Sequence, residues 1–158
     1  MRVVFDTDVI VAALRSRTGA SHALLRALRL GQLEAVASVP MMLEYEAVLM
    51  RPQQQQATGL TAQEVGIFLD SVAALLTPVV PYFLWRPRLR DPDDEMVLDA
   101  AVNGGAEAII TFNEDDFLPG LRNSSWRCSR QPRPSGVSGE GNGENEQLCA
   151  PPTSLAQG

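Results

Sequence analysis

Short apolar runs alternate with longer segments of helical periodicity along most of this chain. Runs typical of buried strands occur at residues 3–5, 33–38 and 107–111. Residues 78–81 (PVVP) are typical of an edge strand, since proline cannot donate to a sheet ladder. Apolar positions repeating every three to four residues predict helices that begin near residues 9, 20, 41, 61 and 94, with Asp93 as a plausible cap of the last. This alternation predicts an α/β fold in which helices cover a sheet of parallel strands.

Thr61 marks the start of the fourth predicted helix, because Thr61 and Glu64 have the spacing of a capping box. The apolar period of this helix continues to about Leu76. The run of glutamines at residues 53–56 is interpreted as a short polar linker in front of it.

The composition changes near residue 122. Residues 122–158 contain only three of Val, Ile and Leu, and Gly, Pro and Ser supply 15 of the 37 positions. Such a segment buries too little apolar surface to offset the entropy of ordering it. We therefore predict a domain at residues 1–121 and a disordered tail at 122–158. Both cysteines, Cys128 and Cys149, fall in this tail and indicate neither a disulfide framework nor a zinc site.

The overall composition limits the classes of function. The net charge is −6, and all 13 basic residues are arginine. An acidic chain is not typical of a nucleic-acid binder, although metal ions that neutralise a carboxylate cluster would allow action on nucleic acid. The sequence has neither an 18-residue apolar run nor a secretory pattern, so we expect a cytoplasmic protein with no membrane span.

Acidic and amide side chains recur where predicted strands end and predicted helices begin. Asp6 directly follows the first strand, where we see no local reason for a charge, whereas Thr7 or Asp8 is interpreted as the cap of the next helix. The other positions are Glu44 in about the first turn of the third helix, Asp94 in the first turn of the helix before the last strand, and Asn113 and Asp116 after that strand. Because these positions share one edge of a parallel sheet, we expect the side chains to face one crevice.

A cluster of carboxylates predicts a bound cation, because like charges packed together are unfavourable without one. Oxygen ligands unaccompanied by histidine or cysteine favour a hard ion, Mg²⁺ or Mn²⁺. Two such ions roughly 4 Å apart can clamp a phosphodiester and activate water.

Four segments together resemble the PIN-domain ribonucleases, and among them the VapC-like toxins of type II toxin–antitoxin pairs. They are residues 3–10 (VVFDTDVI), 40–45 (PMMLEY), 90–98 (RDPDDEMVL) and 110–117 (ITFNEDDF). The resemblance covers residues 1 to about 119. It implies a three-layer sandwich with a short, mostly parallel central sheet and helices on both faces.

The resemblance also implies a metal-dependent endoribonuclease with an antitoxin partner and a homodimeric state. Asp6, Glu44, Asp94 and Asp116 match the catalytic acids, and the same residues with Asn113 match the Mg²⁺ or Mn²⁺ ligands. Thr7 matches the small hydroxyl residue that orients the first acid. Asp8 departs from the usual asparagine and adds negative charge beside the site.

The C-terminus departs further from the family, which continues with one more strand and a closing helix. From Asn123 onward neither pattern occurs, so a sheet edge is expected to stay unpaired, with consequences for stability, dimerisation and activity. The tail is rich in Arg, Pro, Gly and Ser and has no lysine, which is the composition expected when GC-rich DNA is translated in a shifted frame. Sequencing the locus tests this hypothesis.

Two other functions are compatible with parts of the sequence. One is a catalytically inactive PIN-like module that binds an antitoxin or RNA. The other is a phosphatase of the haloacid-dehalogenase type, whose first motif residues 5–8 (FDTD) resemble, although that family needs a lysine and this chain has none. A response-regulator receiver is excluded for the same reason.

Overall fold

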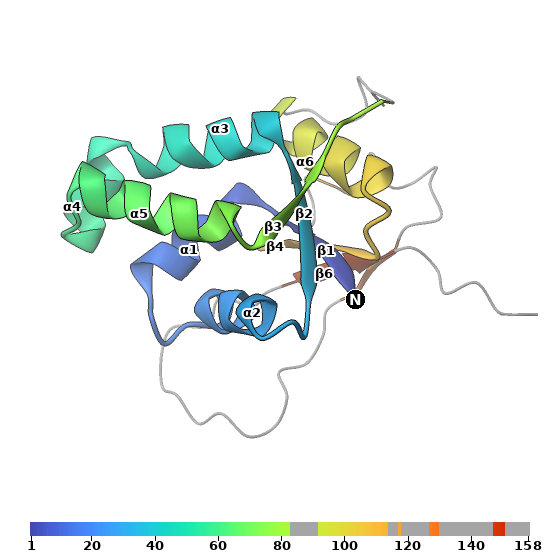
Figure 1. Cartoon of the computed structure of the whole chain (residues 1–158), viewed down its shortest axis with the longest axis horizontal. Coiled ribbons are helices and arrows are strands. Elements are labelled where there is room, and N and C mark those ends of the chain that lie inside the picture. Colours follow the sequence, from blue (N-terminus) through green and yellow to red (C-terminus); the bar gives the residue numbers. More distant parts are fainter. Residues whose placement is uncertain (83–91, 114–116, 118–126, 130–146, 151–158) are drawn as a thin grey trace, which may run out of the picture.

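The computed structural model describes residues 1–82, 92–113, 117, 127–129 and 147–150. Its elements follow the predicted alternation of strands and helices (Figure 1). In chain order they are β1 (Arg2–Phe5), α1 (Thr7–Arg15), α2 (Ala20–Arg29), β2 (Glu34–Ser38), α3 (Val39–Leu49), α4 (Pro52–Thr58), α5 (Ala62–Ala73), β3 (Leu76–Val79), α6 (Pro92–Asn103), β4 (Ala108–Thr111), β5 (Arg127–Ser129) and β6 (Gln147–Ala150).

The strands form one mixed sheet in the order β3-β2-β1-β4-β6-β5. The first four are parallel, whereas β6 pairs antiparallel with β4 and with β5. β1 lies between β2 and β4, and its residues Val3, Val4 and Phe5 are fully buried. Strands covered on both faces are expected to be apolar throughout, as the run at residues 3–5 is.

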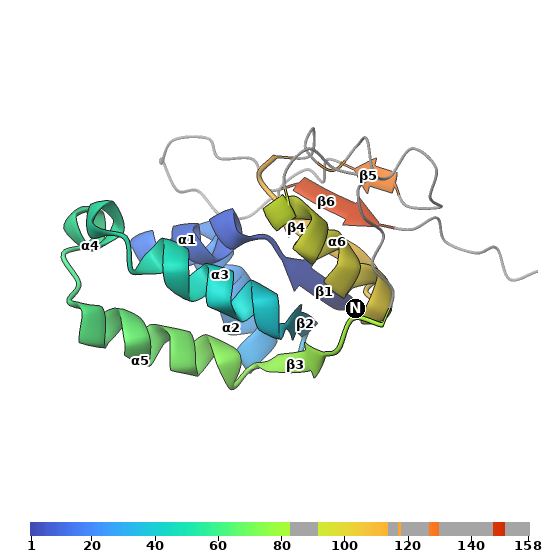
Figure 2. The ribbon, with the colours of Figure 1, turned by 90° about the horizontal axis from the view of Figure 1, so that it is seen from above.

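Helices cover both faces of the parallel strands. α1 and α2 lie on one side and α6 on the other (Figures 1 and 2). The end of α6 approaches the sheet closely, because a Cβ on Gly104 would lie 2.8 Å from Val36 Cγ2. The predicted α/β architecture with a mostly parallel sheet is therefore confirmed. No helix among the described residues has the length and apolar character needed to cross a membrane.

The capping box and the edge strand are confirmed. Thr61 and Glu64 cap each other reciprocally at the start of α5, and β3, which contains Pro78, lies at one edge of the sheet. α5 ends at Ala73, earlier than predicted, because the chain turns into β3.

One prediction about a connecting segment is wrong. The glutamine run at residues 53–56 is not a linker but lies in α4, which has proline at its start and Gly59 in the left-handed region (φ 69°) at its end. Proline at the start and glycine past the end of a helix are the usual residues at those two termini. α3 begins at Val39, two residues before Met41, so Glu44 lies in the second turn.

The C-terminal segment also differs from expectation within the described residues. Two short strands, β5 and β6, form in the range predicted to be disordered, and their register places Cys128 opposite Cys149. β6 pairs with β4, so the edge of β4 that was expected to stay open has a partner strand. Backbone pairing requires no apolar side chains, which is why composition did not reveal these strands.

Candidate active site

Asp6 occupies the end of β1, the strand that lies between β2 and β4. Its backbone N–H donates to the carbonyl of Ile110 on β4 at 2.9 Å, which continues the pairing of the two strands. The side chain is 8% exposed. Asp6 is also the N-cap of α1, so a local reason for its charge exists and the assignment of the cap to Thr7 or Asp8 is wrong.

Two donors hold the carboxylate of Asp6. The backbone N–H of Thr7 donates to Oδ1 at 2.6 Å, and the hydroxyl of Thr111 at the end of β4 donates to Oδ2 at 2.6 Å. Thr111 is fully buried, and its Oγ1 accepts from the N–H of Asn113 at 3.0 Å. Thr111 thereby links Asp6 to Asn113, and it was missing from the residues predicted for the site.

Tyr45 supports the end of β1 from α3. Its hydroxyl donates to the backbone carbonyl of Phe5, the residue before Asp6, and its ring is buried. Burial, and then the negative charge of Asp6, raise the pKa of the Tyr45 phenol far above its usual range. The phenol is therefore neutral at physiological pH and remains a donor.

The remaining predicted residues lie at or near the same edge of the sheet. Glu44 is half-buried in α3, which directly follows β2, and Asp94 is half-buried in the first turn of α6. Asn113 is exposed two residues after β4. Asp8 is exposed in the first turn of α1, and half-buried Thr7 contributes its backbone N–H, as described above, to Asp6.

Asp116 lies outside the described residues, and within those residues no three acidic, histidine or cysteine side chains are grouped to hold a metal ion. The donor chemistry at Asp6 nevertheless fits Mg²⁺ or Mn²⁺. Each oxygen of its carboxylate accepts one of the two hydrogen bonds described, and a carboxylate offers about four lone-pair sites. Carboxylate oxygens are hard donors, which both ions prefer.

The comparison with known proteins identifies the fold family. The family model of the PIN domain matches residues 2–115, well over half of the chain. No curated protein and no solved structure matches. The matched range contains Asp6, Glu44, Asp94 and Asn113 and ends before Asp116. With its parallel sheet covered by helices on both faces, the chain belongs to the PIN-domain family, whose fold is of the nuclease type.

Proposed function

We propose that the protein is a metal-dependent endoribonuclease that hydrolyses RNA phosphodiester bonds and acts as the toxin of a toxin–antitoxin pair. The observation that carries the proposal is the buried carboxylate of Asp6 at the end of a central strand in a PIN domain. Ligands bind at this edge of parallel α/β sheets.

In this proposal Asp6, Glu44, Asp94 and Asp116, together with Asn113, hold Mg²⁺ or Mn²⁺. The bound ion supplies Lewis-acid chemistry and positive charge at the phosphodiester. The chain's own contribution is orientation. Thr7 N–H and Thr111 Oγ1 fix the plane of the Asp6 carboxylate, which limits the rearrangement needed on binding.

The test is a cleavage assay on single-stranded RNA with and without Mg²⁺ or Mn²⁺. Asp6→Asn and Asp94→Asn should each lower the rate by at least about 100-fold, since several kcal/mol of charge stabilisation are lost. The matched controls Asp8→Asn and Asp93→Asn alter exposed acids one or two positions away and should retain most activity. Metal-dependent cleavage that persists in both the Asp6→Asn and the Asp94→Asn variants would contradict this mechanism.

The toxin role and the expected assembly need separate experiments. Expression of the wild-type chain in bacteria should arrest growth, and Asp94→Asn should abolish the arrest. Co-expression of the protein encoded next to this gene should restore growth if it is the antitoxin. Sedimentation of the purified chain tests the proposed homodimer, and fractionation tests the proposed cytoplasmic location.

A second candidate is a folded PIN domain that binds an antitoxin or RNA without cutting. The observation that favours it is Asp8, an exposed acid in the first turn of α1 at a position where the family resemblance implies asparagine. Binding of the neighbouring gene product without any Mg²⁺- or Mn²⁺-dependent cleavage would support this candidate.

A further inference from the structure

The segment that runs from Val9 in α1 to the end of the connection after α2 has an unusual charge composition. Residues 9–33 contain four arginines and one histidine but no acidic residue, although the chain carries 19 Asp and Glu in total. The four arginines, Arg15, Arg17, Arg26 and Arg29, are all exposed. We refer to these four side chains as the arginine surface. It is a concentration of positive charge on a chain whose net charge is −6.

These arginines do not form ion pairs among the described residues. Arg15 donates from Nε to the neutral side chain of Gln54 on α4 at 3.0 Å. The side chains of Arg17, Arg26 and Arg29 make no hydrogen bond or ion pair in the described part of the chain, where the salt bridges involve Met1 and Arg2 instead. The guanidinium groups therefore remain available to an external anion.

Helix stabilisation accounts for only part of this arrangement. Arg15, Arg26 and Arg29 lie in the last turns of α1 and α2, where positive charge interacts favourably with the helix dipole. Arg17 lies outside both helices, so that effect does not apply to it. The dipole also does not explain the lack of acids, since acidic side chains would be favourable in the first turn of α2, which has none.

The arginines are spaced along one helical hairpin. α1 and α2 pack against each other, with Arg17 in the turn between them (Figure 1). Arg26 and Arg29 are three residues apart, which makes them neighbours on the surface of α2. About 10 Å of helix separates the start of α2 from Arg26, at 1.5 Å per residue. The arginine surface is therefore extended, as the backbone of a polyanion is.

We propose that the arginine surface binds the phosphate backbone of single-stranded RNA. The proposal rests on the proposed function, which makes RNA the substrate. The predicted metal ligands are acidic, so the site itself attracts a polyanion poorly until cations bind, and positive charge elsewhere on the surface offsets this repulsion. The guanidinium fork matches phosphate oxygens bidentately. Phosphate contacts would provide affinity and position but no sequence preference.

The experiment measures binding of a labelled 20-nucleotide single-stranded RNA to the full chain in EDTA, which prevents metal-dependent cleavage. The charge variant is Arg26→Gln with Arg29→Gln, and Arg17→Gln is a second variant outside the helices. Arg51→Gln is the matched control, since Arg51 is exposed but lies outside the acid-free segment. Thermal unfolding of each variant confirms that it folds.

The double variant should bind at least about tenfold more weakly at low salt. The slope of log affinity against log salt should become shallower by about 1.4, or 0.7 for each lost phosphate contact. Arg17→Gln should lose about half as much slope, and Arg51→Gln should match the wild type. Unchanged affinity and slope in folded variants of Arg26, Arg29 and Arg17 would overturn the inference. Equal competition by a 20-residue polyglutamate peptide would also overturn it, because the surface would then favour acidic protein over RNA.

The two proposals can fail separately. Arginine-dependent RNA binding by a chain that never cleaves RNA would uphold this inference and contradict the proposed function. Metal-dependent cleavage by a chain whose RNA binding does not depend on these arginines would uphold the proposed function and contradict this inference.

Discussion

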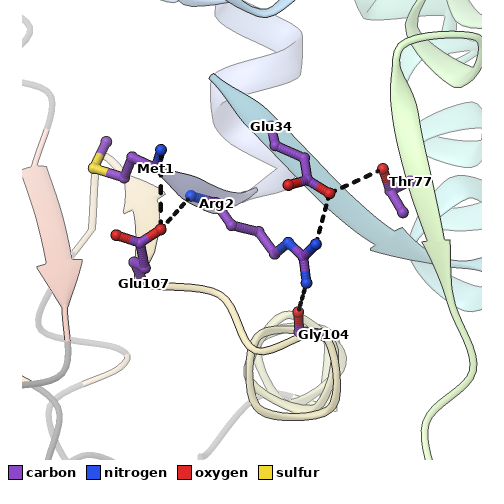
Figure 3. A network of polar contacts seen from close by, with 6 residues as sticks. All are labelled: Met1, Arg2, Glu34, Thr77, Gly104 and Glu107. Carbon is purple, nitrogen blue, oxygen red and sulfur yellow. Dashed lines mark hydrogen bonds and ion pairs between the residues drawn. The ribbon is translucent and has the colours of Figure 1, made fainter. Parts of the chain in front are cut away.

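The two ends of β1 both carry charged groups, but in opposite surroundings. At its start, Arg2 lies in an exposed network in which its Nη2 donates to Glu34 Oε1 at 2.8 Å and its Nη1 to the carbonyl of Gly104 at 3.1 Å (Figure 3). Glu107 accepts from the Arg2 backbone N–H at 2.8 Å in the same network. Beyond the other end, Asp6 is buried and held by a backbone N–H and a hydroxyl.

At the start of β1 the polar contacts join neighbouring elements in water, whereas beyond its end they hold a buried carboxylate. The Arg2–Glu34 pair is more than 40% exposed on both side chains, so water competes for it and its contribution to stability is small. Asp6 is removed from water, and a buried charge is costly unless its hydrogen bonds are well formed. Asp6 meets this condition, because its carboxylate caps α1 and also accepts from the Thr111 hydroxyl.

Loss of the Thr111 hydroxyl should have the largest effect. Thr111→Val keeps the shape of the side chain and removes the hydroxyl that donates to Asp6 Oδ2. We expect a loss of about 1–3 kcal/mol in the free energy of unfolding, from a buried acceptor left without this donor. We expect RNA cleavage to fall about 10- to 100-fold, as is typical when the partner of a metal ligand is removed.

The matched control is Thr77→Val at the exposed end of the sheet. The Thr77 hydroxyl lies 3.5 Å from Glu34 Oε1, so little stability is lost with it. The free energy of unfolding in urea and the rate of RNA cleavage are measured for both threonine variants. Equal values for the two variants would contradict the distinction between the two ends of β1.

Tyr45→Phe should have the next largest effect. The change leaves the buried carbonyl of Phe5 without the phenol donor and should cost about 1–3 kcal/mol of unfolding free energy. Tyr82→Phe is the control, because Tyr82 is 84% exposed. Equal unfolding midpoints in urea for the two variants would show that the Tyr45 hydroxyl does not support β1.

The same tyrosine predicts a dependence of stability on alkaline pH. Its folded-state pKa is raised above the usual value of about 10, first by burial and then by the charge of Asp6. Below about pH 10 the neutral phenol is present in both states, and above it only the unfolded state ionises, so stability is lost as the pH rises. Wild type should therefore lose more stability than Tyr45→Phe between pH 9 and 11, a trend that parallel urea titrations would show or refute.

Glu34→Gln should have the smallest effect. The hydrogen bond from Arg2 is the main cause that lowers the pKa of Glu34 below 4.5. A lowered pKa contributes stability that is present above pH 4.5 and is lost as the pH falls through the folded-state value. The melting temperature of the variant should be slightly below that of wild type at pH 7 and equal to it at pH 3. A large difference in melting temperature at both pH values would show that the Arg2–Glu34 contact contributes more to stability than an exposed ion pair should.

The elements of the fold were largely predictable because local patterns specify them. The apolar run ending at Phe5, the Thr61–Glu64 capping box and the edge position of the Pro78 strand all follow from neighbouring residues. α4 also follows from local residues, Pro52 at its start and Gly59 after its end, although the polar glutamine run between them has no apolar period and favoured a linker. β6 was not predictable, since its pairing with β4 joins residues far apart in a segment poor in apolar side chains.

The site was predictable only in part. Asp6 is visible in the sequence because a charge directly follows a buried strand. Its partners depend on long-range packing, with Thr111 lying 105 positions away. A hydroxyl residue at the end of a predicted strand was the available signal for Thr111, and a tyrosine beside Glu44 was the signal for Tyr45. Neither signal indicates by itself which strand end the side chain contacts.

Mn²⁺ binding to the full chain is the decisive test of the proposal that the buried carboxylate of Asp6 binds the catalytic metal ion. Calorimetric titration should show Mn²⁺ affinity at least about tenfold lower for Asp6→Asn than for wild type, since losing a ligand should cost no less than losing its hydrogen-bond partner. Asp8→Asn, which alters an exposed acid two positions away, should remain close to wild type. Equal Mn²⁺ affinity of wild type and Asp6→Asn, with both folded, would contradict the claim.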